Sequence, residues 1–222
     1  MGWVIRTLSS SLGAKYIMAI TGLGLVGFIV AHLSGNFLLF AGEEAFDAYA
    51  EFLHSKPALI WTMRLGLLAI TVLHIGSAIR LTKLNSEARP SKYVAEKSLA
   101  VGFAGRTMIW SGLIIAAFMV YHIAHYTLMI VGAESSALGR AGEKYKMVVA
   151  GFSQVPVSAF YIIAMALLCM HLSHGVSSLF QSLGLHHPKY NKFIKLIAPV
   201  FAGIMFVGFS SIPLSVLLGI VK

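Results

Sequence analysis

The sequence predicts an all-α integral membrane protein, with five transmembrane helices in one bundle. Of its 222 residues, 58% are hydrophobic and only 11% are charged, and the mean hydropathy is +0.82. An ordinary soluble domain is about 45–50% apolar and about 25% charged, so this composition excludes that class. A spanning helix needs roughly 20 mostly apolar residues. Five runs meet this requirement, at about 16–40, 58–82, 107–131, 157–181 and 196–220, and they leave little room for anything but a single transmembrane domain over residues 1–222.

The segments that connect these runs differ in charge. With the N-terminus in the cytoplasm, the inner segments carry 11 of the 17 Lys and Arg residues, and the outer segments carry six of the eight Asp and Glu residues. Membrane proteins concentrate Lys and Arg on the cytoplasmic side. The sequence therefore predicts a cytoplasmic N-terminus and a C-terminus outside. The net charge of +9 then reflects topology or a docking surface for an acidic partner, and we expect no nucleic acid.

Several functional classes have no support in the sequence. The single Cys169 lies inside the fourth run, so it builds neither a disulfide framework nor an iron–sulfur cluster, which usually needs four thiolates. No phosphate loop, nucleophile elbow or dinucleotide fingerprint follows a strand pattern. The first run is too long for a secretory signal, and we expect it to remain as a helix.

A shorter helix is predicted in the first outer loop, over residues 43–54. Its apolar residues Phe46, Tyr49, Ala50 and Leu53 have the spacing of one helix face. Such a helix is expected to lie along the outer membrane surface as a lid. It is either a plain connector or, through Glu51 or His54, part of a proton-coupled quinone site beneath it.

Four of the five runs carry a histidine near the middle of the membrane: His32, His74, His122 and His171. An imidazole in hydrocarbon is costly without a partner, and an intramembrane ionisable residue is by default a functional candidate. Depth follows from the rise of 1.5 Å per residue. His32 and His122 lie roughly 5 Å from the membrane centre toward the outer surface, and His74 and His171 lie roughly 3–6 Å from it toward the inner surface. The histidines thus form two pairs at two depths, each pair on parallel helices.

Two imidazoles facing each other across a helix bundle are suited to six-coordinate haem iron, which has no open position and transfers electrons. Two such irons would be separated by about 10 Å in depth. Structural zinc is less well matched, because it gathers four ligands at one level. A proton relay or transporter usually includes buried carboxylates, and the five runs contain no Asp or Glu. Individual histidines can also be hydrogen-bonded packing residues.

Some choices within the site stay open. His125 and His174 follow His122 and His171 by three residues on the same helix face, so either member of each doublet can reach an iron. The depths favour the first member, which leaves the second to hold a haem propionate, a quinone oxygen or a neighbouring helix. Three arginines are further candidates for binding propionates, although topology explains the last two equally well: Arg64, Arg80 and Arg106.

Five stretches, in this order along nearly the whole chain, resemble the cytochrome b membrane-anchor subunit of succinate dehydrogenases and fumarate reductases, of the five-helix, two-haem type. They are SSSLGAKYIMAITGL with AHLSGN, GEEAFDAYAEFLHSKP, LHIGSAI, VYHIAHY and HLSHGVSSLF. The resemblance implies two haem b groups, with His32 and His122 ligating the distal haem and His74 and His171 the proximal one. His174 falls where relatives can carry another polar residue, which supports His171 as the ligand.

The resemblance also implies the partners and the setting. A flavoprotein subunit with FAD and an iron–sulfur subunit would dock on the cytoplasmic face, near the basic segments 83–106 and 189–195. Succinate or fumarate chemistry would belong to them, while this chain passes electrons to membrane quinone, with menaquinone expected at the outer side. The location would be the inner (cytoplasmic) membrane of a prokaryotic cell, and the complex can form a higher oligomer. The alternatives are a cytochrome b serving a hydrogenase, formate dehydrogenase or ascorbate-type donor, and a haem-free transporter or proton channel.

Overall fold

A computed structural model describes residues 2–8, 10–88, 105, 107–185 and 187–222 of the chain, and the described part is helical without strands. Five of its helices are long and apolar enough to cross a membrane, which confirms the predicted all-α class and the five candidate spans. They are α2 (Ser11–Asn36, continued by the short 3₁₀ helix η1, Phe37–Ala41), α4 (Pro57–Glu87), α6 (Met108–Tyr126), α9 (Val155–Ser182) and α10 (Pro188–Leu217).

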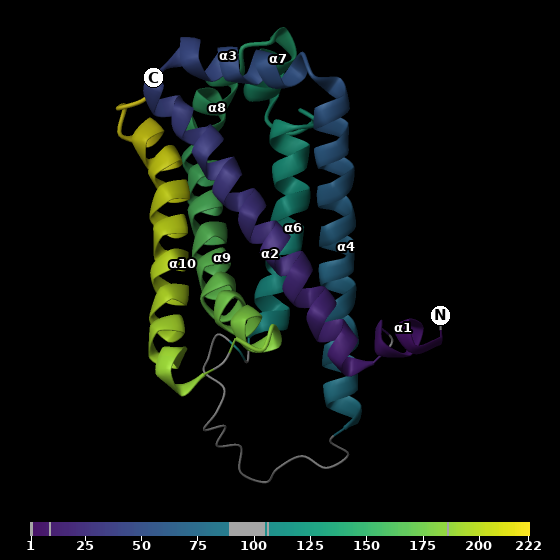
Figure 1. Cartoon of the computed structure of the whole chain (residues 1–222). Helices are drawn as coiled ribbons and strands as arrows, with labels where there is room; N and C mark the ends of the chain where they lie inside the picture. The colour runs from purple at the N-terminus through teal and green to yellow at the C-terminus, as the bar shows by residue number, and fades with distance from the viewer. Residues whose placement is uncertain (1, 9, 89–104, 106, 186) are drawn as a thin grey trace.

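The long helices run side by side, and α2 crosses the bundle obliquely (Figure 1). One end, here called the N-terminal end, carries α1 (Gly2–Leu8) and the turn between α9 and α10. The other, the cap end, carries α3 (Glu43–His54), α7 (Ala133–Ala141) and α8 (Lys144–Ser153). The chain starts at the N-terminal end and finishes at the cap end, so its termini lie at opposite ends of the bundle.

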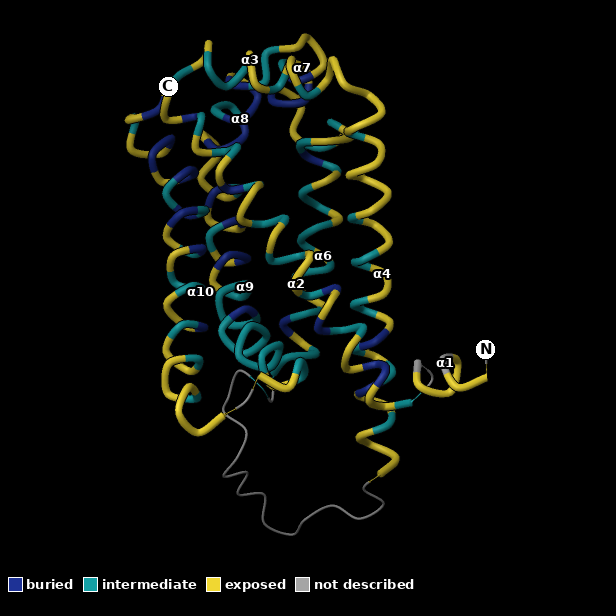
Figure 2. Tube along the Cα trace, in the orientation of Figure 1, coloured by how far each residue is buried: buried dark blue, intermediate teal, exposed yellow. Residues whose placement is uncertain are grey.

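The bundle consists of two helix pairs and a supporting helix. Helix α2 packs mainly on α4, α6 packs on α9, and α10 lies against α9 and also touches α2. Buried residues are concentrated in α10 and the cap, and fewer lie in α2 and α9, whereas α4 is largely exposed along its length (Figure 2). Its exposed side chains are mostly apolar, as expected for a surface that faces lipid. Helix α10, which carries no histidine, is thus a packing helix, as predicted.

The interfacial helix has the predicted bounds. Helix α3 spans Glu43–His54 and lies across the cap end (Figure 1). Its Phe46 packs against the buried core cluster. The Tyr49 ring lies over Gly35 of α2, where an added Cβ would be 3.1 Å from a ring carbon. The apolar face of α3 therefore covers the bundle, as its spacing predicted.

The segment between the third and fourth spanning helices differs from the prediction. The third spanning helix was expected to reach residue 131 but ends at Tyr126, because the chain turns back on itself there. The amides of Leu128 and Ile130 bond carbonyls in the last turn of α6, and the Arg140 guanidinium donates to the Met129 carbonyl at 2.6 Å. Two short helices that were not predicted, α7 and α8, then complete the cap.

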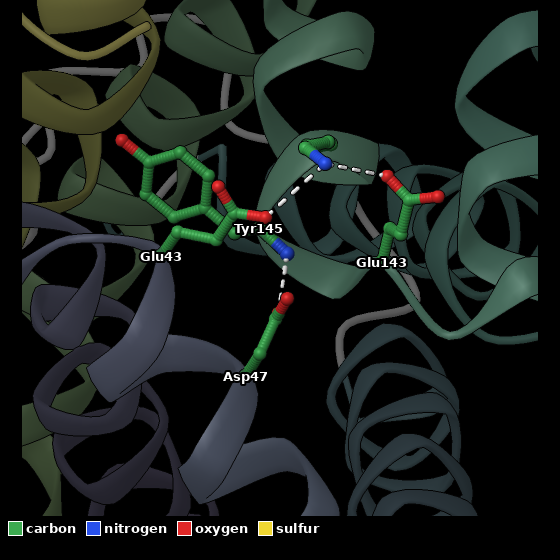
Figure 3. Close-up of polar contacts among 5 residues, drawn as sticks. Glu43, Asp47, Glu143 and Tyr145 are labelled. Atoms are coloured by element: carbon green, nitrogen blue, oxygen red, sulfur yellow. Dashed lines mark hydrogen bonds and ion pairs between the residues drawn. The ribbon is translucent and has the colours of Figure 1, made fainter.

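A cluster of polar contacts joins α3 to α8 (Figure 3). The Asp47 carboxylate accepts a hydrogen bond from the Tyr145 amide at 2.7 Å, in the first turn of α8. The Lys146 ammonium lies 2.8 Å from a Glu143 oxygen and 3.3 Å from a Glu43 oxygen. Hydrogen bonds to Glu143 and Glu43 raise the pKa of Lys146 above its usual value. Asp47 therefore caps a helix distant in sequence and fixes the lid on the bundle.

We expect Asp47→Ala to loosen the cap. A hydrogen bond to a charged acceptor contributes roughly 1.5–3 kcal/mol. The substitution should lower the free energy of unfolding by an amount of that order, seen as a lower thermal midpoint of the detergent-solubilised protein. Glu51→Ala on the same helix removes an exposed carboxylate and should leave the midpoint unchanged. Equal midpoints for the two variants would contradict the role given to Asp47.

Candidate functional site

The structure brings His32 and His122 together near the cap end. Their ring centroids are 5.7 Å apart and their planes are inclined by 85°. Each ring is stacked on a phenylalanine one turn earlier in its own helix, with centroids 5.4 Å apart for Phe28 and His32 and 5.9 Å apart for Phe118 and His122. The ring centroid of Phe209 in α10 lies 6.0 Å from that of His32. Two imidazoles thus face each other inside an aromatic shell, and we call them the cap-end pair.

The spacing of the cap-end pair suits a shared metal ion. Metal–imidazole bonds in proteins are about 2 Å long, so two nitrogens on one metal are about 4 Å apart. Ring centroids lie further back than the ligating nitrogens, so the observed centroid distance of 5.7 Å is of the right size. The pair therefore lies at a separation at which two imidazoles can share one ion.

The other two histidines, called the N-end pair, occupy equivalent positions in the two helix pairs. His74 of α4 lies against Thr21 and Gly22 of α2, with its Nδ1 3.2 Å from the Thr21 hydroxyl. His171 of α9 lies against Ser111 and Gly112 of α6, with its Nδ1 3.1 Å from the Ser111 hydroxyl. A Cβ at Gly22 or Gly112 would be 3.3 or 3.5 Å from the Cε1 of the facing imidazole. Each ring thus packs against a hydroxyl residue and the glycine that follows it in the neighbouring helix, a pair of residues that we call a hydroxyl–glycine step.

The hydroxyl contacts determine the tautomer of both rings. The Thr21 hydroxyl donates to the Ile17 carbonyl at 2.7 Å, and the Ser111 hydroxyl donates to the Met108 carbonyl at 3.0 Å. Each hydroxyl has a single proton and directs it to that carbonyl, so each is assigned as accepting from the imidazole, with the ring proton on Nδ1. The Nε2 atoms of His74 and His171 are therefore left with a lone pair. Histidine ligands commonly donate their second ring N–H in this way, which fixes the tautomer and raises the basicity of the ligating nitrogen.

The two pairs lie at separate levels. Thr21 precedes His32 by 11 residues, and Ser111 precedes His122 by 11 residues. At a rise of 1.5 Å per residue, the two levels are about 16 Å apart along α2 and along α6. This separation exceeds the expected depth difference of about 10 Å. That expectation measured the depth of each histidine from the middle of its own apolar run.

Thr21 and Ser111 were not predicted, although the sequence contains a signal for them. Residues 21–32 read TGLGLVGFIVAH and residues 111–122 read SGLIIAAFMVYH, with Gly, Leu, Phe, Val and His at matching positions. The shared pattern is a hydroxyl–glycine step, a phenylalanine seven residues after the hydroxyl and a histidine four residues later. Comparing α2 with α6 would have revealed that the two helix pairs present the same residues to their histidines.

The hydrogen bonds distinguish the two members of the first doublet. His125 is 1% exposed, and both its ring nitrogens are engaged, Nδ1 with the Tyr161 hydroxyl and Nε2 with the Ser135 hydroxyl, each at 3.2 Å. His122 contacts the Tyr161 hydroxyl through Nδ1, at 3.4 Å, and its Nε2 has no hydrogen bond to any described residue. This favours His122 as the ligand, as the depths did. His174 is half-buried and has no hydrogen bond to any residue the structure describes, so the second doublet is not distinguished in this way.

The remaining candidates lie at the edges of the bundle. Arg64 is exposed, with its guanidinium 5.3 Å from the Trp61 ring centroid, and Arg80 is half-buried. Arg106 is outside the described residues. Glu51 and His54 are exposed on α3, where His54 Nδ1 lies 2.7 Å from the Ala50 carbonyl of its own helix. Their part in a quinone site stays a prediction.

The donor set is consistent with a cofactor that supplies most of its own metal ligands. Among the described residues, His, Cys, Asp and Glu form no group of three or more that could hold a metal ion. Each level thus offers two imidazoles. Structural zinc takes four protein ligands, whereas haem iron needs only axial ligands from the protein. The chain was also compared with protein-family models, curated proteins and solved structures, and none of these comparisons gave a match.

We expect Gly22→Val to disturb the N-end pair. Its side chain would displace the His74 ring, and overpacking of this kind typically costs about 1–3 kcal/mol. The thermal midpoint should fall, and the imidazole nitrogen NMR shifts of ¹⁵N-histidine protein should report loss of the Nδ1–H tautomer at one histidine. Gly27→Val is the matched control, because nothing lies within 4 Å of a Cβ there. A Gly22→Val variant that behaves like Gly27→Val would contradict the contact.

Proposed function

We propose that this chain is a dihaem cytochrome b, with His32 and His122 as axial ligands at one level and His74 and His171 at the other. The observation that carries the proposal is the hydrogen bonding of Nδ1 at three of these four imidazoles, which leaves Nε2 for a metal. A bis-histidine haem iron, when bound, supplies one-electron transfer without an open position for oxygen.

The surrounding residues have simple physical roles in this proposal. Thr21 and Ser111 orient the N-end imidazoles, and their neighbouring glycines let the rings lie close to the backbone. The rings of Phe28, Phe118 and Phe209 surround the cap-end pair and exclude water. The hydrocarbon core of a bilayer is about 30 Å thick. Two levels about 16 Å apart therefore extend over a large part of the membrane.

We further propose that the chain is the membrane anchor of a succinate:quinone oxidoreductase. This rests on the resemblance of its histidine-bearing stretches and of the 43–54 segment to that family. A flavoprotein subunit with FAD and an iron–sulfur subunit would bind at the N-terminal end, on the cytoplasmic side of a prokaryotic inner membrane. The chain would carry electrons between the iron–sulfur partner and quinone, with menaquinone the expected type. Exposed lysines at the N-terminal end, among them Lys83, Lys189 and Lys192, supply positive charge for such docking.

Ligand variants test the haem assignment. The purified protein should show low-spin haem b in its reduced-minus-oxidised spectrum, with two haems per chain by pyridine haemochrome. His32→Ala and His74→Ala should each remove one haem, because an iron with a single axial imidazole is held weakly. His187→Ala, at an exposed histidine outside the bundle, should retain both. Loss of both haems or of neither in the first two variants would refute the two-level assignment.

Co-purification tests the choice of partner. The intact complex should contain a covalent or tightly bound flavin and iron–sulfur clusters, and succinate should reduce its haem. Reduction by hydrogen, formate or ascorbate in place of succinate would assign the chain to another quinone-linked cytochrome b. A purified protein without a Soret band that transports ions in vesicles would indicate a haem-free transporter.

A further inference from the structure

A chain of hydrogen bonds leads from the cap to His122. The Ser135 hydroxyl of α7 donates to the Gly132 carbonyl at 3.2 Å and lies 3.2 Å from His125 Nε2. His125 Nδ1 lies 3.2 Å from the Tyr161 hydroxyl, which is 3.4 Å from His122 Nδ1. Four side chains from three helices thus connect a backbone carbonyl of the cap to a candidate iron ligand.

The proton positions along this chain of hydrogen bonds follow from its end at Ser135. The Ser135 proton is assigned to the Gly132 carbonyl, so Ser135 accepts from His125 Nε2–H. His125 Nδ1 is then an acceptor and takes the Tyr161 proton. Tyr161 in turn accepts from His122 Nδ1–H, and the lone pair of His122 is left on Nε2. The direction of the hydrogen bonds, assigned from the cap end of the chain, therefore leaves His122 in the tautomer that an axial ligand requires.

We propose that Ser135, His125 and Tyr161 are positioning residues that orient His122 and tune the reduction potential of the cap-end haem, an inference that rests on the dihaem function proposed above. A hydrogen bond from the Nδ1–H of a ligand makes its Nε2 a stronger donor, which stabilises the oxidised metal. His125 thereby has a role other than ligation. The cap helix α7, absent from the predicted topology, becomes part of the electron-transfer site.

Burial distinguishes this chain from ordinary packing. His125 and Ser135 are 1% and 3% exposed, so their polar atoms depend on one another, and a connected buried network rigidifies its members. Tyr126 offers a contrast within the same cluster. Its ring is stacked on His125 at a centroid distance of 4.0 Å, yet its buried hydroxyl has no partner among the described residues. Tyr161 and Tyr126 therefore contribute similar rings, and only Tyr161 contributes a hydrogen bond to the chain.

A potentiometric titration of the two haems in the intact complex tests the proposal. Tyr161→Phe keeps the ring and removes the hydroxyl, so the cap-end haem should become easier to reduce. Loss of one hydrogen bond of this kind changes an equilibrium by about tenfold, or about 59 mV for one electron. The N-end haem should keep its potential. Tyr126→Phe is the matched control and should shift neither haem.

Two further variants locate the effect along the chain. His125→Phe should retain both haems and raise the potential of the cap-end haem, since Tyr161 loses its acceptor. Ser135→Ala should give a smaller shift in the same direction. The low-temperature electron paramagnetic resonance signal of the cap-end ferric haem should move with the potential in each case, whereas a purely structural role would leave it in place. If Tyr161→Phe does not assemble, His125→Phe and Ser135→Ala carry the test.

The outcomes separate this inference from the proposed function. A wild-type protein without haem refutes the dihaem function itself. Two haems in the wild type, with unchanged potentials in all three variants, refute the hydrogen-bond chain alone. Loss of the cap-end haem in His125→Phe, with a potential unaffected by Tyr161→Phe, would make His125 the ligand and overturn the inference.

Discussion

The constraint on which this structure depends is that an imidazole inside a membrane needs a partner for its N–H. Water cannot supply one there, and an unpaired polar group in hydrocarbon costs several kcal/mol. The chain meets this need at His74 and His171 with hydroxyls from neighbouring helices, and at His122 with a phenol. In each case the hydrogen bond is made at Nδ1. In the proposed function, the requirement to satisfy the ring thereby leaves Nε2 for a metal.

The arrangement of helices follows from the same contacts. Helices α2 and α6 each carry a hydroxyl–glycine step and, 11 residues later, a histidine of the cap-end pair. Helices α4 and α9 each bring one histidine to the step of their partner. Two helix pairs of the same design thus bring His32 and His122 together and place His74 and His171 at equivalent positions nearer the N-terminal end. Helix α10 supports this arrangement from outside, where Gly208 lets it approach Leu33 of α2 closely.

Much of this architecture is readable from the sequence, because hydropathy and helix rise are local properties. The five spans, the bounds of α3 and the pairing of His32 with His122 all follow from run lengths and residue spacing. Helices α7 and α8 do not, since their hydrophobic pattern is weak and long-range contacts such as Asp47 with Tyr145 stabilise them. The hydroxyl partners were also missed, because a threonine or serine in an apolar run ordinarily bonds its own helix, and only the facing histidine gives it a second role.

The asymmetry between the two levels has a physical basis. The N-end imidazoles contact hydroxyls that are themselves hydrogen-bonded to backbone carbonyls. One ring of the cap-end pair, that of His122, is instead held by a longer chain of hydrogen bonds through Tyr161 and His125. The His32 ring contacts the rings of Phe28, His122 and Phe209 and makes no hydrogen bond to any residue that the structure describes. The two levels can therefore differ in electronic properties although their ligands are of the same type.

Anomalous diffraction at the iron absorption edge, on crystals of the intact complex, tests the central claim most directly. The account predicts two iron peaks within this chain, about 16 Å apart along the bundle. One should lie between the Nε2 atoms of His32 and His122, and the other between those of His74 and His171. A single peak, peaks beside His125 or His174, or no iron within the helices would contradict it.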